Sequence, residues 1–462
     1  MEVPISDEIN DETIFDLYDL RHQLTKKTEV RFKGWVSKIQ RFKRHAFVTI
    51  RDGPGLMYSI QVVVDQLPKV SEEAYVQITG ILVDLPREKY AAEISDWIPG
   101  QSIQKFEVRA KEFLVLSDSD PDFQSRCPTD AGPDLKLSER HLYLRDPQFS
   151  LITKARSILI QAIRKHFEST HCAEIFPATF TSSECEGGAS LFKVDHVGQE
   201  AYLTESSQFQ LEYAVPSFGS CYCIAPSYRA EKSHTRRHLT EFLHAEAEWS
   251  GILTFHDHLE KLTELVRHTL SRFIIICDKE MILQQLGKRE RVLELIKMEI
   301  IELSHKDAIA YCRTHEIYKH EPTKTHFGPR DDIPEAQERQ MIDRIGKIVL
   351  LTKFPRETKS FYMASDPDDE SYALGCDVEV PGVGEIIGSG VRVSKYDELL
   401  TRLTDSKMKI DDYKEYLDLR KYGHGKTSGM GLGVDRMLTW ILGMHSIREV
   451  VTYPRYPGHL RP

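Results

Sequence analysis

Asparagine is nearly absent from this 462-residue sequence: Asn10 is the only one, whereas aspartate, serine and glutamine are common. The eight cysteines include no CxxC pair, and Cys221 and Cys223, which alternate along one predicted strand, cannot form a zinc knuckle by themselves. No apolar run is long enough to span a bilayer, and the acidic start of the chain is unlike a signal or transit peptide. We therefore expect a cytoplasmic protein with reduced cysteines.

The chain also has no surplus of positive charge: its formal net charge is −10. This balance argues against a generally basic nucleic-acid binder, so any RNA contact has to come from local basic patches on an acidic body. The hydrophobic fraction of 40% and the charged fraction of 29% are typical of globular proteins. Since 462 residues exceed one ordinary core, we expect two domains, or one large domain with appendages.

Short alternating strands dominate residues 29–116. They include 30–36, 46–50 and 59–64, and this density of strands predicts a small Greek-key barrel of the OB type. Phe47 lies in the second strand, directly after a basic stretch that contains Lys38, Arg41, Lys43 and Arg44. An aromatic ring beside basic side chains is how such barrels hold single-stranded bases. The alternative is that Phe47 belongs to the barrel core.

Four regions are expected along the chain. Residues 1–28 form a short acidic arm, 29–116 the barrel, 117–134 a hinge linker rich in proline, aspartate and serine, and 135–462 a larger domain with a mixed helical region at about 253–354. Apolar periodicity in the larger domain predicts helices over 151–166, 256–277 and 281–304, and strands over 360–363, 376–380 and 385–393. A glycine-punctuated turn over 428–436 is expected to open a helix that ends at Leu442.

The most informative segment is a predicted hairpin over residues 221–249. Its second strand has a period of two, which places Phe242, His244, Glu246 and Glu248 on one face and apolar residues on the other. An aromatic ring, an imidazole and two carboxylates are unfavourable to bury unless a ligand covers them. The loop between the strands is rich in arginine and histidine and suits a polyphosphate, because arginine donates two parallel hydrogen bonds to phosphoryl oxygens. A salt-bridged surface hairpin is the alternative.

Two further segments resemble known motifs, a phosphate-binding loop and a metal site, but each contains residues that argue against the motif. Residues 424–427 read like the end of a phosphate-binding P-loop, but Arg420 stands where that motif needs a glycine. His234 and His238 have the spacing of helical metal ligands, but the arginines between them favour an anion over a zinc ion.

The hairpin and two other segments resemble the class II aminoacyl-tRNA synthetases. Residues 228–231 with 237–242 resemble motif 2, residues 429–436 resemble motif 3, and the segment ending at Phe176-Pro177 resembles motif 1. Together with the barrel, these motifs are similar to the subgroup that charges aspartate, asparagine and lysine, over about residue 29 to Pro462. Within the subgroup, the asparaginyl-tRNA synthetases of eukaryotes and archaea are most similar over residues 186–192, 204–208, 244–248 and 384–388.

The resemblance implies an α+β fold, in which an N-terminal OB-type barrel precedes a catalytic domain built on an antiparallel sheet with flanking helices. It implies that Arg229 binds the α-phosphate of ATP, that Glu231 accepts from the adenine amino group, and that Phe242 and Arg436 lie on the two adenine faces. Arg436 also reaches the γ-phosphate, so Arg229 and Arg436 are the catalytic pair. Arg237 and His238 are further ATP ligands, and Asp377 and Glu385 would hold Mg²⁺ through carboxylate oxygens.

The amino-acid site follows from the same resemblance. Glu186, Ser206 and Gln208 match positions that hold the α-amino group, and Arg392 matches the arginine that reads the side-chain carbonyl. Aspartate enzymes carry a lysine where this chain has Leu211, and an aspartate where it has Glu246; both differences favour asparagine. Three positions depart from the family pattern, namely Glu205, Gly388-Ser389-Gly390 and Asp435.

The expected partners are ATP, L-asparagine, the asparagine tRNA and a second copy of the chain, which would pair through motif 1 around Pro177. Phe47 and Gln61 are the expected anticodon contacts. Three alternatives remain from the sequence: an aspartyl enzyme, a paralogue that passes the adenylate to another amine, and a relic of the fold without activity. The single asparagine suggests the hypothesis that synthesis of the protein is insulated from asparagine shortage, with compositional bias as the alternative.

Overall fold

The computed structural model describes residues 29–52, 58–84, 102–182, 184–185, 191–232 and 235–461. The predicted acidic arm, Asn10 and Glu186 lie outside these residues. The chain divides into two compact units. One comprises the described residues up to Lys154 with Asp278–Leu286, and the other comprises Ala155–Cys277 and Gly287–Arg461.

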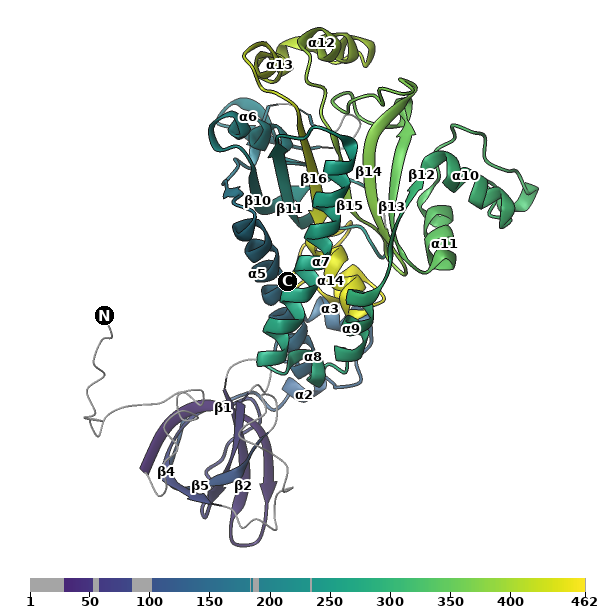
Figure 1. Ribbon diagram of the computed structural model, residues 1–462. Helices are drawn as coiled ribbons and strands as arrows, with labels where there is room; N and C mark the ends of the chain where they lie inside the picture. The colour runs from purple at the N-terminus through teal and green to yellow at the C-terminus, as the bar shows by residue number, and fades with distance from the viewer. Residues whose placement is uncertain are drawn as a thin grey trace. The chain divides into compact units, whose positions relative to one another are not determined.

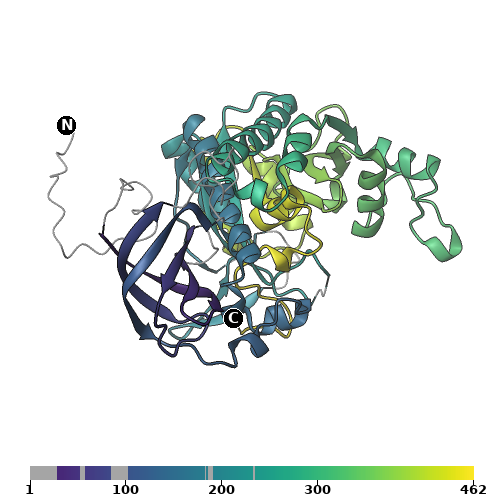
Figure 2. The same cartoon turned by 90° about the horizontal axis from the view of Figure 1, so that it is seen from below.

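The first unit contains a closed five-stranded barrel in the order β1-β2-β3-β5-β4, which confirms the predicted OB fold (Figure 2). Alternate residues such as Phe32, Val48 and Ile60 are completely buried and fill its interior. Phe47 lies between buried Ala46 and Val48 and is itself partly exposed, so it is not part of the barrel core. The strands are β1 (Glu29–Arg41), β2 (Ala46–Asp52), β3 (Tyr58–Val64), β4 (Tyr75–Asp84) and β5 (Ser102–Ser117).

Short helices follow the barrel in the same unit. The stretch expected to be a hinge linker contains α2 (Phe123–Arg126) and the beginning of α3 (Pro133–Ser138), and α4 (Arg140–Tyr143) comes directly afterwards. Tyr143 donates a hydrogen bond to the carbonyl oxygen of Pro128 at 3.0 Å, which ties this stretch to the helix that follows it. The stretch 117–134 is therefore partly helical.

The second unit is built on an eight-stranded sheet in the order β12-β13-β14-β15-β16-β11-β10-β6 (Figure 1). Its central strands are antiparallel, and the outer pairs β12–β13 and β10–β6 are parallel. The bounds are β6 (Ala173–Glu174), β10 (Cys221–Tyr228), β11 (Glu241–Ser250), β12 (Ile300–Ser304), β13 (Ile348–Pro355), β14 (Tyr372–Val380), β15 (Gly384–Val391) and β16 (Thr427–Gly433). A separate three-stranded sheet has the order β7 (Phe180–Thr181), β9 (Gln199–Leu203), β8 (Phe192–His196).

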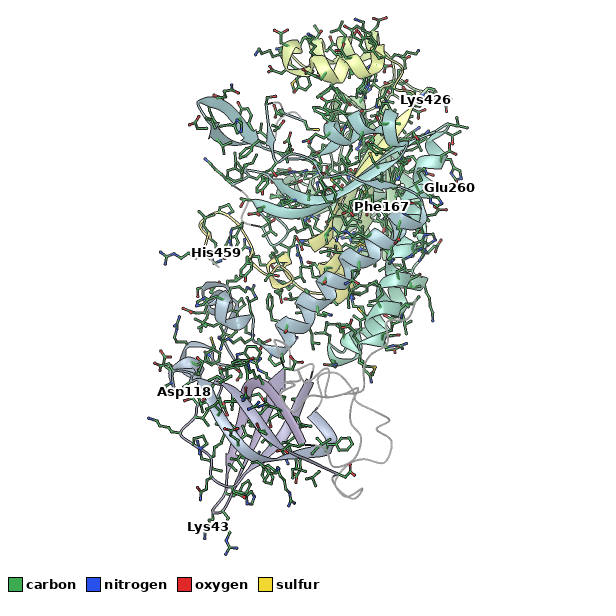
Figure 3. All side chains as sticks on the ribbon, turned by 90° about the vertical axis from the view of Figure 1, so that its left-hand side faces the viewer. Lys43, Asp118, Phe167, Glu260, Lys426 and His459 are labelled. Atoms are coloured by element: carbon green, nitrogen blue, oxygen red, sulfur yellow. The ribbon has the colours of Figure 1, made fainter. Side chains whose placement is uncertain are left out.

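Helices pack on this framework through apolar stripes. In α7 (Phe255–Lys279) the buried residues Leu262, Val266, Leu270 and Phe273 recur every three or four positions, as one helical face requires. Phe167 of α5 (Pro147–Ser169), which is labelled in Figure 3, stacks on Tyr222 of β10. Their ring centroids lie 4.4 Å apart. The other helices of this unit are α6 (Gln208–Phe218), α9 (Arg289–Lys297), α10 (His305–Thr314), α11 (Glu335–Ile345), α12 (Tyr396–Asp405), α13 (Lys414–Lys421) and α14 (Val434–Leu442), whereas α8 (Ile282–Gln285) belongs to the first unit. Within the described ranges, no helix is both long and apolar enough to cross a bilayer.

Three predictions of secondary structure were wrong. The region 281–304 is not one helix, because Gly287 adopts a positive φ between α8 and α9, and residues 300–304 pair with β13 instead. Residues 360–363 are not a strand, since the Met363 N–H donates to the Ser360 carbonyl at 3.1 Å and closes a turn. The Met363 side chain lies over Gly375 and Gly390, where it fills the space of two missing side chains. The glycine-rich segment before α14 is the strand β16 and not a turn.

Candidate active site

The two strands of the predicted hairpin, β10 and β11, pair in the middle of the sheet. Cys223 lies opposite Glu246, and Ala225 lies opposite His244. The polar face that period two predicts is present, since His244, Glu246 and Glu248 are all buried and all line cavities. The hairpin is therefore not a salt-bridged surface feature.

One cavity brings together every residue for which the sequence predicted ATP contact. The Arg229 guanidinium carbon lies 5.4 Å from the centroid of the Phe242 ring. Arg436 donates to the backbone carbonyl of Glu385 at 3.1 Å, so motif 3 and β15 meet in this cavity. The predicted residues that line it are Arg229, Glu231, Arg237, His238, Phe242, Glu385 and Arg436.

Arg237, on the cationic side of this cavity, is positioned by two neighbouring segments of the chain. Arg237 pairs with Glu335 of α11 at 3.0 Å and donates to the Val383 carbonyl. Gly384, which has a φ of +87°, leaves the room that this arginine occupies. Burial and the nearby Arg436 lower the pKa of His238, because both disfavour a second positive charge beside this arginine.

A second cavity contains the described residues that were predicted to bind the amino acid, Ser206, Gln208, Glu246 and Arg392. Leu211, which stands in place of a lysine, also lines it. The two cavities share Arg229, His244, Glu385 and Gly431, so they adjoin at these side chains. A ligand that extends from one cavity into the other would pass Arg229 and Glu385.

Glu246 is fixed by the loop that precedes α6. The Ser206 hydroxyl donates to Glu246 Oε1 at 2.5 Å, and the backbone N–H of Ser207 donates to Oε2 at 2.8 Å. Ser206 and Ser207 therefore hold this carboxylate in one position, and the exposed fraction of Glu246 is only 3%.

Arg392 belongs to a buried ionic network that the sequence did not predict. Its Nη2 donates to Glu248 Oε2 at 2.9 Å, and its Nε lies 3.7 Å from Glu212 Oε1. Glu212 in turn accepts from Arg420 and from the Tyr416 hydroxyl at 2.7 Å. Burial opposes the ionisation of Glu212, but Arg420 and Arg392 outweigh it and hold its pKa below the ordinary value. Arg392 is therefore already paired with two protein carboxylates, Glu248 and Glu212.

Asp377 on β14 and Glu385 on β15 come from neighbouring strands. A Cβ at Gly388 would lie 2.9 Å from Glu385 Oε1 and 3.8 Å from Asp377 Oδ1, so the missing side chain leaves space beside both carboxylates. Carboxylate oxygens are the ligands that Mg²⁺ prefers, and Mg²⁺ is often bound by one or two carboxylates plus substrate phosphates. The donor set fits this ion. Among the described residues, no group of three or more ligating side chains is arranged around a metal position.

Lys359 is a further member of this region that no sequence pattern indicated. Its Nζ lies 2.6 Å from Asp377 Oδ2 and 3.5 Å from the centroid of the Phe354 ring. It therefore engages one oxygen of Asp377, while the other oxygen is the one nearest to Gly388.

The glycines of β16 have a defined role in the site. A Cβ at Gly429 would overlap Glu248 Oε2 and Arg392 Nη2, and a Cβ at Gly431 would overlap the His244 imidazole. Because β16 pairs with β11, each of these glycines opens space for a polar side chain of the neighbouring strand. This explains why a strand rich in glycine lies at the centre of the sheet.

The predicted anticodon residues lie in the first unit, on the barrel. Phe47 of β2 lies opposite Val63 of β3, and Gln61 lies opposite Thr49, so both belong to neighbouring strands. The Gln61 amide donates to Glu107 Oε2 at 3.3 Å. The sequence did not predict Glu107 as the partner of Gln61, because a glutamate within a strand gives no local signal of such a contact.

Comparisons with known proteins agree with this arrangement. Residues 30–116 match the family described as an OB-fold nucleic acid binding domain, and residues 132–457 match the class II tRNA synthetases (D, K and N). The cytoplasmic asparagine–tRNA ligase of Dictyostelium discoideum is 36% identical over 94% of this chain, which spans 65% of that protein's length. The human cytoplasmic asparagine–tRNA ligase is 37% identical over 94% of this chain, which spans 77% of its length.

Solved structures of asparaginyl-tRNA synthetases are also similar to this chain. The Entamoeba histolytica asparaginyl-tRNA synthetase in complex with asparaginyl-adenylate has a TM-score of 0.85 and 32% identity, covering 98% of this chain and 100% of that one. The Pyrococcus horikoshii asparaginyl-tRNA synthetase complexed with asparaginyl-adenylate has a TM-score of 0.81 and 31% identity, covering 95% and 97%. A putative aspartyl-tRNA synthetase from Leishmania major Friedlin, with 20% identity and a TM-score of 0.79, shares the fold. The chain belongs to the asparaginyl-tRNA synthetase family of class II aminoacyl-tRNA synthetases.

Proposed function

We propose that this protein ligates L-asparagine to its tRNA through an asparaginyl-adenylate intermediate, with release of pyrophosphate and then AMP. The observation that carries the proposal is the junction of the two cavities at Arg229 and Glu385. An amino acid in one cavity and ATP in the other would bring a carboxylate next to the α-phosphate at that junction. Positioning of this kind supplies much of the catalysis in phosphoryl and nucleotidyl transfer.

In the first step, a carboxylate oxygen of asparagine attacks the α-phosphorus, and the bond to pyrophosphate breaks. Arg229 would compensate the charge that develops on the α-phosphate, and Arg436 and His238 would hold the outer phosphates. Asp377 and Glu385 would hold Mg²⁺, which when bound neutralises phosphate charge. In the second step, a terminal ribose hydroxyl of the tRNA attacks the acyl carbonyl and AMP leaves. Neither step needs a protein nucleophile.

The buried network favours asparagine over aspartate. Arg392 already pairs with Glu248 and Glu212, so it can donate to a neutral carbonyl of the substrate and needs no carboxylate on the substrate side chain. Leu211 supplies no cation, and the fixed Glu246 carboxylate would accept from an amide and repel a carboxylate. Removing a cation and placing an anion both disfavour an aspartate side chain.

The remaining partners are part of the same proposal. The barrel would bind the anticodon through Phe47 and Gln61, and the larger domain after the helical stretch 117–134 would perform the chemistry. A second copy of the chain would cover motif 1, where Phe176, next to Pro177, is 86% exposed. The names of the relatives support a place in the cytoplasm.

The test is ATP–pyrophosphate exchange with asparagine and with aspartate, followed by charging of total tRNA. We expect exchange with asparagine and transfer of asparagine to tRNA. Exchange that runs equally well with aspartate would indicate the aspartyl alternative. Exchange without tRNA charging would indicate the paralogue, and no exchange at all would indicate a relic without activity.

A further inference from the structure

The hairpin between β1 and β2 carries a cluster of three aromatic rings, Phe42, His45 and Phe47, which we call the hairpin cluster. The Phe42 and His45 ring centroids lie 5.3 Å apart with an interplanar angle of 20°, so these rings are stacked. Phe47 meets both rings edge-on, at 5.5 Å and 80° from Phe42 and at 5.0 Å and 78° from His45. The cluster therefore presents two planes that are almost perpendicular.

Phe42 is the exposed member of the cluster, with 55% of its surface accessible. His45 covers one face of its ring, and the high exposure leaves surface of the ring to solvent. Phe47 is only partly exposed and lies within β2, on the outer side of the barrel. The two phenylalanines therefore offer different surfaces to a ligand.

Positive charge surrounds the hairpin cluster. Lys38, Arg41, Lys43 and Arg44 are all exposed, on a protein whose net charge is −10. Lys43 lies at the free end of the hairpin and points away from the barrel (Figure 3). Lysine and arginine neutralise backbone phosphates, and flat aromatic surfaces stack on unpaired bases.

We propose that Phe42 is a second base-stacking platform, which binds an unpaired base of the tRNA anticodon loop next to the base expected on Phe47. This inference rests on the proposed function. The perpendicular ring planes suit two bases that are splayed apart, as proteins commonly hold the bases of single-stranded RNA loops. A base on Phe42 would extend the stack of Phe42 on His45, and the basic residues of the hairpin would contact the adjoining phosphates.

The test is the binding of an anticodon stem–loop RNA of the asparagine tRNA, measured by fluorescence anisotropy. Phe42→Ala should weaken binding by about 5- to 150-fold, the range for one stacked base, and Phe42→Tyr should retain it. Leu114→Ala is the matched control, because Leu114 of β5 is a large apolar side chain of the same barrel with 45% exposure. This control should bind RNA like the unaltered protein, and thermal unfolding checks that all three variants fold.

A second arm assigns the platforms to separate bases. Stem–loops that lack one anticodon-loop base at a time should show one position at which Phe42→Ala has no further effect, and a different position for Phe47→Ala. Unchanged RNA binding by Phe42→Ala, or the same position for both variants, would overturn the inference. An unaltered protein that does not charge tRNA would instead refute the proposed function.

Discussion

Glu248 and Arg392 form a buried ion pair with 2.9 Å between Oε2 and Nη2, and both atoms occupy space that is open only because residue 429 is glycine. Gly429→Ala should displace the pair and reduce kcat/KM for asparagine in pyrophosphate exchange by about 10²-fold, as small misplacements in active sites do. Gly132→Ala is the control, since a Cβ at Gly132 meets nothing within 4 Å. Unchanged asparagine kinetics in Gly429→Ala would contradict a role of the pair in positioning.

The second prediction concerns the junction of the two cavities. Arg229→Ala should slow exchange by about 10²- to 10³-fold, the usual effect of removing a donor aimed at developing charge. Glu385→Ala should abolish exchange at ordinary Mg²⁺ and weaken the binding of Mn²⁺, which electron paramagnetic resonance detects. Arg164→Ala, which removes only a surface ion pair with Glu174 at 3.0 Å, is the control. Exchange near the normal rate in either site variant would rule out the proposed roles.

The third prediction tests the choice between asparagine and aspartate. Glu246→Asp combined with Leu211→Lys should raise the aspartate-to-asparagine ratio of kcat/KM by about 10- to 100-fold, the range for a hydrogen bond to a charged group. The shorter carboxylate would draw back from the substrate, and the lysine would pair with an aspartate side chain. Exchange kinetics with both amino acids measure the ratio. A folded double variant with an unchanged ratio would show that selectivity comes from other residues, such as the network around Arg392.

The polar face of β11 could be predicted from the sequence because a strand has a period of two, and in β11 polar and charged residues alternate with apolar ones. The family motifs could be recognised because each lies within one short segment. The partners of Arg392 could not, since Glu248 lies 144 positions away in the chain and only the tertiary fold brings the two residues together. Lys359 was missed for the same reason, because it lies in a loop with no period that points to Asp377.

Glycine was the most misleading residue type. Its presence in residues 428–436 favoured a turn, because glycine usually marks a break in regular structure. The structure has a strand there, in which Gly429 and Gly431 are required by side chains of β11 and not by their own backbone angles. Close approach by a neighbouring strand leaves no trace in local sequence, so this role could be seen only in three dimensions.

The fourth prediction concerns acid stability. His258 is buried between the hydroxyls of Ser428 and Ser389, at 3.0 and 2.9 Å, and burial together with Arg392 lowers its pKa to about 3. Because this pKa lies below that of an unfolded histidine, the contribution of His258 to stability is present above about pH 6.5 and is lost as the pH falls towards 3. This residue alone should lower the free energy of unfolding by about 1.4 kcal/mol for each pH unit below that point.

Urea unfolding between pH 7.5 and 5.5 measures this effect. His258→Gln, which cannot take up a proton, should show a shallower loss of stability with falling pH. His166, whose pKa burial and His268 lower to about 4, adds a similar slope in both proteins and therefore cancels in the comparison. An equal slope for the variant and the unaltered protein would mean that other groups account for acid unfolding.

The fifth prediction concerns the turn between β8 and β9, where Val197 and Gly198 connect the paired residues His196 and Gln199. Both turn residues have a positive φ, +55° for Val197 and +84° for Gly198. Two-residue turns of this kind prefer Asn-Gly, and a β-branched residue with a positive φ is strained. Val197→Asn should therefore raise the free energy of unfolding by about 1 kcal/mol. Val197 is 94% exposed, so its replacement removes no buried packing.

Urea unfolding of Val197→Asn checks this gain, with Val194→Asn as the control. Val194 lies in β8 of the same hairpin and is partly buried, so asparagine there should destabilise. A gain at position 197 would mean that the fold favours asparagine at a turn where the sequence does not use it. The backbone preference of this turn would then not explain why asparagine is absent from it. Insulation of the protein's synthesis from asparagine shortage, and compositional bias, would both remain as explanations. A loss of stability at position 197 would contradict the expected preference of this turn for asparagine.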